Sequence, residues 1–298
     1  MSVKNTIPNL LTLGNLLSGV FGIVALTWHG FPEVAAGCIL LGGLFDVCDG
    51  AVARLLKASS PIGAQLDSLA DLVTFGVLPG LIAYTYIPVT VHGLGLDAWM
   101  PEWIRYAAFL IPAAGAWRLA MFNVTDSNST KFKGLPIPAN GVFWACIPLM
   151  LLASTANEFF GIRAGYSAAG ADFTLRDYRA VPEAPTALSE LQTMLPPAKF
   201  ETTVDPWWDL LSHGSLVAFF AVLLSVLMVS RVELMSFKMK AGERRPLWIW
   251  LGLSVAVIAT TSIVYLNPFA AIPIVLLLYL VISIASTLFS RSRHAVQS

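Results

Sequence analysis

The sequence has 298 residues, of which 56% are hydrophobic and 12% are charged, and its mean hydropathy is +0.72. Roughly a quarter of the residues in a soluble domain are charged, so this composition excludes a soluble domain. The 18 basic residues balance 18 acidic residues, which leaves no general basic surface for nucleic acid. Cys38, Cys48 and Cys146 lack CxxC and CxxH spacing, which argues against zinc, iron–sulfur and disulfide frameworks.

Eight apolar stretches are each long enough to cross a bilayer core about 30 Å thick, which needs roughly 20 helical residues. In chain order they are Asn9–Trp28, Glu33–Leu56, Gln65–Ile87, Arg105–Val124, Pro138–Ala156, Leu210–Val232, Leu247–Leu266 and Phe269–Phe289. The first lacks a strong basic region and a small-residue cleavage site, so we interpret it as a retained span and not as a signal peptide. The expected fold is an all-α, polytopic membrane helix bundle with about eight transmembrane helices, forming a single membrane domain over residues 1–298.

The distribution of lysine and arginine predicts how the bundle is oriented. Of the 18 basic residues, 13 fall on one side of the predicted spans, which also carries both termini, and five fall on the other. Cytoplasmic loops are enriched in these residues, so we expect a protein of the cytoplasmic (inner) membrane with both termini in the cytoplasm. The proline-rich residues 157–209 are predicted to form an extracytoplasmic loop insertion. Within it, Thr186–Leu195 has the pattern of a short amphipathic helix, although the density of proline favours an irregular loop.

Four aspartates lie inside the second and third predicted spans, where an ionisable side chain is costly and is a candidate for function. They belong to the pattern D-x2-D-G-x2-A-R-x8-G-x3-D-x3-D, whose fixed positions are Asp46, Asp49, Gly50, Ala53, Arg54, Gly63, Asp67 and Asp71. Steps of three and four residues place the acidic members of each span on one helix face. The segment containing Ser60-Pro61 supplies a turn, so the two acidic faces are predicted to be antiparallel neighbours.

Carboxylates gathered in this way repel one another unless cations lie among them, and hard oxygen ligands suit Mg²⁺, Mn²⁺ or Ca²⁺. Two such ions can clamp a diphosphate. Gly50, Ala53 and Gly63 leave room for a phosphate ligand, and Arg54 is placed to pair with phosphate oxygens. Asp46 lies roughly 15 Å from the cytoplasmic end of its helix, so the site is expected to face the cytosol. Binding of a transported cation or a proton relay remains an alternative from these residues alone.

The aspartate pattern resembles, at every fixed position, the signature of the CDP-alcohol phosphotransferase family. Flanking residues such as Asn9, Thr12 and the run Phe132–Ala139 are similar to the phosphatidylserine synthase branch, and the resemblance extends over most of the chain outside residues 157–209. It implies a homodimeric enzyme in the lipid bilayer that joins CDP-diacylglycerol and L-serine to give phosphatidylserine and CMP. Glycerol 3-phosphate or inositol phosphate is the alternative acceptor within the same chemistry.

The resemblance also implies roles for individual residues. Asp46, Asp49 and Asp67 would ligate a two-ion centre of Mg²⁺ or Mn²⁺, and Asp71 would complete it and act as the general base. The residues implied to line the CDP-lipid pocket are Asn9, Thr12, Asp49, Gly50, Ala53, Arg54 and Gly63. For Asn9 and Thr12 the alternative is an ordinary interhelical hydrogen bond.

Serine also carries a carboxylate that needs a nearby cation. Arg118 is the first choice for this contact, followed by Lys133 and Arg231. A lipid-phosphate contact is the alternative for Arg118, and an ordinary cytoplasmic loop charge is the alternative for Lys133. Met121 stands where the branch usually has an arginine, so the chain has one cation fewer in this region.

Overall fold

The computed structural model describes residues 3–58, 60–87, 102–124, 134–159, 214–230, 232, 245–264 and 267–297. Within these ranges the chain is helical and contains no β-strand, which confirms the all-α prediction. Almost all of the predicted loop insertion at residues 157–209 lies outside the described residues, and so does the segment Thr186–Leu195.

Each of the eight predicted spans corresponds to a helical segment. In chain order the elements are α1 (Val3–Thr27), α2 (Pro32–Leu56), α3 (Pro61–Asp71), η1 (Leu72–Val77), α4 (Leu78–Tyr86), η3 (Glu102–Phe109), α5 (Leu110–Val124), α6 (Ile137–Phe159), α9 (Gly214–Val229), α10 (Arg245–Val264) and α11 (Pro268–Gln297). Four segments are long and apolar enough to cross a membrane, namely Thr6–Thr27, Pro32–Leu56, Pro61–Tyr86 and Trp103–Val124. The other four contain shorter apolar helices. The chain is therefore a polytopic membrane protein.

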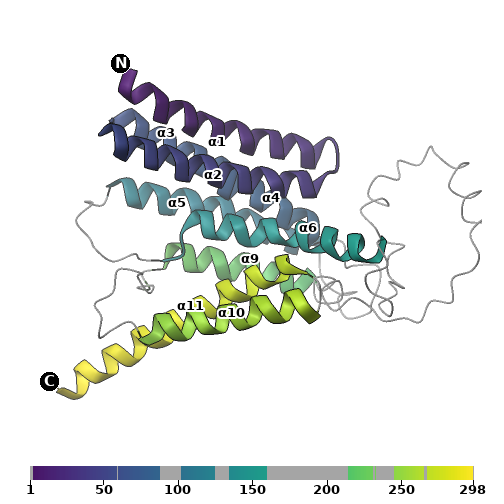
Figure 1. Cartoon of the computed structure of the whole chain (residues 1–298), viewed down its shortest axis with the longest axis vertical. Coiled ribbons are helices and arrows are strands. Elements are labelled where there is room, and N and C mark those ends of the chain that lie inside the picture. Colours follow the sequence, from purple (N-terminus) through teal and green to yellow (C-terminus); the bar gives the residue numbers. More distant parts are fainter. Residues whose placement is uncertain are drawn as a thin grey trace, which may run out of the picture.

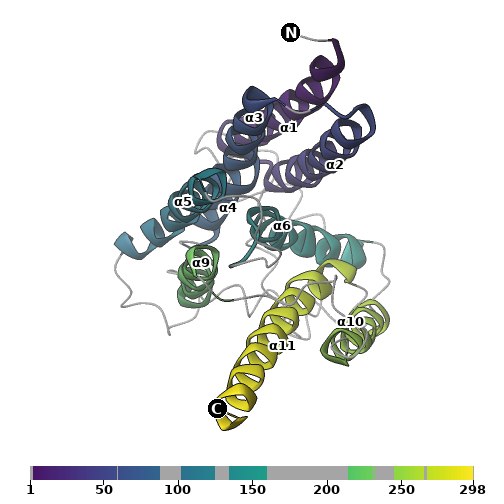
Figure 2. The ribbon, with the colours of Figure 1, turned by 90° about the vertical axis from the view of Figure 1, so that its left-hand side faces the viewer.

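The helices form a bundle in which α1, α2 and α5 run in nearly the same direction and α11 is inclined to them (Figure 1). The end of α1 nearest the N-terminus and the end of α11 nearest the C-terminus lie at the same end of this bundle (Figure 1). Seen nearly along the helices, α1, α2 and α3 form one part of the molecule, α10 and α11 form another, and α6 and α9 lie between them (Figure 2).

The third predicted span differs from a single regular helix. It is a continuous segment in which α3 is followed by a π-helical turn, η1, and then by α4. Phe75 in η1 and Trp144 in α6 are fully buried, and α6 packs against both η1 and α2. The widened turn thus lies in the centre of the bundle, directly after Asp71.

A short turn connects α2 to α3 and sets how the aspartate-bearing faces meet. Lys57 has the left-handed conformation with φ 49°, and the Ala58 N–H donates to the Ala53 carbonyl at 2.9 Å, which closes the end of α2. The Ser60 side chain then accepts a hydrogen bond from the Gly63 N–H at 3.0 Å, and Pro61 occupies the first turn of α3. These caps explain why α3 begins at Pro61 and not at the predicted Gln65.

Candidate active site

Three carboxylates from two helices converge next to this turn. Asp46 and Asp49 lie one turn apart on α2, and Asp67 lies on α3; one carboxylate oxygen from each falls within 4.8 Å of the others. Asp49 is buried, whereas the other two side chains are half-buried. The buried Oδ1 of Asp67 has no hydrogen-bond partner among the described residues. Three acidic groups so close together, with one buried oxygen unsatisfied, could hold a positively charged ligand.

Helix α1 supplies a hydroxyl group to this cluster. The buried Thr12 Oγ1 lies 2.6 Å from Asp49 Oδ2 and 3.1 Å from the carbonyl oxygen of Pro8. Because a hydroxyl has one proton and the carboxylate contact is shorter, the geometry favours donation to Asp49. This bond holds one oxygen of the Asp49 carboxylate in place.

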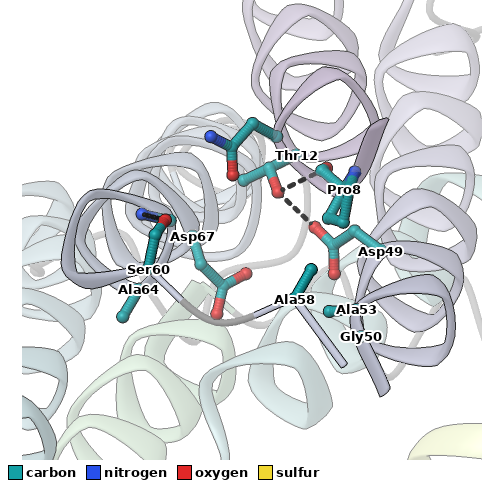
Figure 3. A pocket seen from close by; sticks show the side chains of 11 residues that line it. Pro8, Thr12, Asp49, Gly50, Ala53, Ala58, Ser60, Ala64 and Asp67 are labelled. Carbon is teal, nitrogen blue, oxygen red and sulfur yellow. Dashed lines mark hydrogen bonds between the residues drawn. The ribbon is translucent and has the colours of Figure 1, made fainter. Parts of the chain in front are cut away.

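A cavity of about 220 Å³ opens beside the carboxylates. Its lining comes from α1, α2, α3 and the turn between α2 and α3: Pro8, Asn9, Thr12, Asp49, Gly50, Ala53, Ala58, Ser60, Gly63, Ala64 and Asp67. Figure 3 shows the Asp49 and Asp67 carboxylates pointing into this shared space from opposite sides. A Cβ atom on Gly63 would lie 3.1 Å from Asn9 Oδ1, so even a methyl group would crowd this wall. The cavity lining therefore combines small residues with acidic and polar side chains.

Arg54 is exposed and does not belong to the cavity lining. Its guanidinium lies close to the lining, because a Cβ atom on Gly50 would be 3.4 Å from Arg54 Nη1. The arginine thus sits at the edge of the cavity, one helical turn from Gly50. An anionic group in the cavity would be within reach of this flexible side chain.

Asp71 is not one of the three carboxylates that lie within 4.8 Å of one another, but it is close enough to interact electrostatically with all three. It is buried one helical turn beyond Asp67, and its Oδ1 accepts a hydrogen bond from Asn15 Nδ2 at 3.1 Å. Asn15 belongs to α1, so this bond joins α1 to the end of α3. Among the four neighbouring aspartates, Asp71 thus differs from the group of three by its burial and by its amide donor, Asn15.

Arg118 faces the end of another helix. Its Nη1 donates to the Met228 carbonyl oxygen in α9 at 3.1 Å, and a Cβ atom on Gly134 would lie 2.8 Å from the same Nη1. A cation at the C-terminus of a helix stabilises the exposed carbonyls there. Lys133 and Arg231 lie outside the described residues.

Several site residues were not singled out from the sequence as functional. Asn15 contacts Asp71; from the sequence it was one position of the flanking pattern Asn9-x2-Thr12-x2-Asn15-x3-Gly19, without a role assigned to it. Asn123 Nδ2 donates to Ser68 Oγ at 3.0 Å and connects α5 to the helix that carries Asp67. Helical periodicity relates only residues a few positions apart, so the contact between Asn123 and Ser68 could not be predicted from the sequence and was found in the structure.

The donor set fits a divalent cation. The converging atoms are carboxylate oxygens, which are hard ligands suited to Mg²⁺, Mn²⁺ and Ca²⁺. The unsatisfied Asp67 Oδ1 provides an acceptor that is already directed into the protein interior. The cluster can therefore hold a cation beside a cavity large enough for a phosphate-bearing ligand.

Comparison with known proteins identifies similar sequences. Residues 5–170 match the family model described as CDP-alcohol phosphatidyltransferase. The CDP-diacylglycerol–serine O-phosphatidyltransferase of Bacillus subtilis is 37% identical over 153 residues, covering 51% of this chain and 78% of that protein. Proteins of the same name from Helicobacter pylori and Saccharomyces cerevisiae are 36% and 40% identical, and the chain spans about half the length of each, 54% and 48%. The family match includes the whole aspartate pattern and ends before α9.

Proposed function

The chain belongs to the CDP-alcohol phosphatidyltransferase family, and from this premise we propose that it condenses CDP-diacylglycerol with L-serine to give phosphatidylserine and CMP. One observation carries the proposal: Asp46, Asp49 and Asp67 converge beside an open cavity in the part of the chain that is similar to serine-using relatives. The acyl chains of the lipid would remain in the bilayer while the nucleotide enters the cavity. L-Serine would approach from the cytosol.

The cavity lining accounts for nucleotide binding in this proposal. Gly50, Ala53 and Gly63 let the diphosphate approach the helix backbones, and Asn9 offers a polar side chain to the nucleotide. Arg54 at the edge would donate to phosphate oxygens. The hydrogen bond from Thr12 orients the Asp49 carboxylate, and this carboxylate therefore keeps a fixed direction before the substrate binds.

Asp46, Asp49 and Asp67 would hold the divalent cation, with Mg²⁺ or Mn²⁺ as the natural choices, Ca²⁺ as an alternative, and a second ion adjoining Asp71. When bound, such ions neutralise the diphosphate and polarise the phosphorus that is attacked. This arrangement gives the buried carboxylates the positive partner that their proximity requires.

Asp71 would be the general base. The serine hydroxyl oxygen attacks the lipid-linked phosphorus, a new P–O bond forms, and the bond from that phosphorus to the CMP oxygen breaks. Asp71 accepts the hydroxyl proton, and CMP leaves with the electron pair of the broken bond. Asp71 is not a member of the group of three within 4.8 Å and has its own amide donor, which supports this different task.

The recognition of serine is assigned to Arg118 first and to Lys133 second. The Arg118 guanidinium is a cation with several N–H donors, which is the chemistry that a serine carboxylate requires, and its Nη1 lies at the end of α9. Met121, on the following helical turn, contributes no charge in this region. Acceptors that carry a phosphate would require a denser basic pocket.

The proposed setting is the cytoplasmic membrane, with both termini and the active site on the cytosolic side and with the enzyme acting as a homodimer. The asymmetry of lysine and arginine supports this orientation. The common position of the two chain ends in the bundle supports it as well (Figure 1).

The test is CMP release by the purified chain in mixed micelles that contain CDP-diacylglycerol and Mn²⁺ or Mg²⁺. L-Serine, glycerol 3-phosphate, inositol phosphate and no acceptor are compared, with and without EDTA. Release that requires both serine and metal is the expected result. Release with another acceptor alone would reject serine as substrate, and no release under any condition would favour a cation transporter.

A further inference from the structure

Asn15 links the carboxylate of Asp71 to the first helix. Its Nδ2 donates to Asp71 Oδ1 at 3.1 Å, and both side chains are buried. A carboxylate can only accept, so the amide nitrogen must face Asp71 and the amide oxygen must face away. The other described residues give Asp71 no further hydrogen bond, so this amide alone among them defines how the carboxylate is turned.

The amide of Asn15 is itself held in a tightly packed position. Its Oδ1 is buried without a hydrogen-bond partner among the described residues. A Cβ atom added to Gly42 would lie 2.7 Å from this oxygen and 2.5 Å from Thr74 Cγ2. The backbone of α2 at Gly42 thus lies directly against the Asn15 amide oxygen, and the absence of a side chain there makes room for it.

Thr74 fixes the backbone of the same residue. Its buried hydroxyl donates to the Asn15 carbonyl oxygen at 2.9 Å. Thr74 lies in the π-helical turn that begins directly after Asp71, so one short segment is joined to Asn15 twice, through Asp71 and through Thr74. Two bonds to one residue hold the end of α3 at a defined rotation relative to α1.

We infer that Asn15 is a positioning residue that holds the Asp71 carboxylate so that Oδ2 is directed to the acceptor hydroxyl, with Gly42 and Thr74 holding Asn15. The inference rests on the proposed function, because it gives Asp71 the role of base. Misplacement of a reacting group by about 1 Å can cost roughly a hundredfold in rate. The amide therefore contributes to turnover without touching the substrate.

Two variants test whether Asn15 positions Asp71: one removes the amide donor, and the other crowds the amide. Asn15→Leu keeps the approximate shape of the side chain and removes its N–H donor. Gly42→Ala leaves every hydrogen-bonding group in place but adds a methyl group against the Asn15 amide and Thr74. Both are expected to lower kcat about 10- to 100-fold, while the KM for CDP-diacylglycerol changes by less than about threefold because the nucleotide cavity is unaltered.

Matched controls lie on the same two helices. Ser18→Ala removes a buried hydrogen bond of 2.7 Å from α1 to the Cys38 carbonyl, one turn beyond Asn15. Gly37→Ala adds a methyl group to α2 at a point with no atom within 4 Å. Both controls are expected to keep the kcat of the parent protein.

Every rate is divided by the number of sites that bind a CDP probe stoichiometrically, so that misfolded protein does not lower kcat. An unchanged kcat per site in Asn15→Leu would overturn the inference, and so would an equal loss in Ser18→Ala. If the parent protein releases CMP only with another acceptor, the serine proposal fails and Asn15 is tested with that acceptor. If no acceptor supports release, both proposals fail.

Discussion

Asp67 and Asp71 lie one helical turn apart, yet their surroundings are different. Asp67 joins two aspartates of α2, and one of its buried oxygens has no hydrogen-bond partner among the described residues. Asp71 accepts a hydrogen bond from the Asn15 amide and stands outside that group. Residues of one type on one helix face are therefore suited to two tasks, holding a cation and moving a proton.

Asp71→Asn is expected to lower turnover by about 10²- to 10⁴-fold, because the amide cannot accept the serine proton. Binding of CDP-diacylglycerol should persist, since Asp71 does not line the cavity. Steady-state CMP release and equilibrium binding of the nucleotide measure the two effects. A near-normal rate in this variant would remove Asp71 from the role of base.

Arg118→Ala is expected to have two effects. Loss of a charge-assisted bond to the Met228 carbonyl should cost about 1.5–3 kcal/mol and lower the unfolding temperature. If Arg118 also binds the serine carboxylate, the KM for serine should rise far more than the KM for CDP-diacylglycerol. Thermal unfolding measures the first effect and steady-state kinetics measure the second. A loss of stability with an unchanged serine KM would leave Arg118 a structural role at the end of α9 and would reject its role in binding serine.

The apolar stretches and the helical spacing of the aspartates predicted most of the helices and the way in which the aspartate-bearing faces meet. The steps of three and four residues placed Asp46 and Asp49 on one face, and Ser60-Pro61 indicated the turn that brings Asp67 opposite them. The π-helical turn after Asp71 was not predicted. Hydropathy does not distinguish an α-helical from a π-helical turn, and the packing of Thr74 against α1 depends on residues far away in the sequence.

At Gly19, α1 lies close against this π-helical turn, and we expect this position to tolerate no larger side chain. A Cβ atom on Gly19 would lie 2.5 Å from Thr74 Oγ1 and 3.0 Å from Thr74 Cα, and a backbone atom cannot move aside cheaply. Gly19→Ala should therefore destabilise the bundle by about 1–3 kcal/mol and lower turnover. Gly14→Ala is the control because its nearest neighbours, at 3.2 Å, belong to the Phe45 ring. Equal unfolding temperatures for the two variants would contradict this account.

At the scale of the whole molecule, composition predicted a membrane helix bundle, and the structure confirms that class. The sequence could not show that Arg118 meets α9, because that contact joins residues separated by 110 positions. The same limit applies to Asn123 and Ser68, which are 55 positions apart. Contacts within one helix or across one short turn follow from spacing, whereas contacts between distant helices depend on how the whole bundle packs.

The orientation of the bundle gives a prediction at this scale. A protease-cleavable tag at either terminus should be cut in inside-out membrane vesicles and protected in right-side-out vesicles. The physical reason is the excess of lysine and arginine on the side that carries both termini. A tag on the periplasmic loop of a separate membrane protein serves as the control with the opposite pattern. Cleavage of the two tags from opposite sides would contradict an even number of crossings.

In the proposed reaction, the serine hydroxyl oxygen attacks the lipid phosphorus of CDP-diacylglycerol. This step can be followed with L-serine labelled with ¹⁸O in its hydroxyl group, by locating the label through mass spectrometry of the lipid and nucleotide products. Phosphatidylserine should retain the label, and CMP should carry none. CMP formed without labelled phosphatidylserine, or label recovered in CMP, would contradict the proposed reaction.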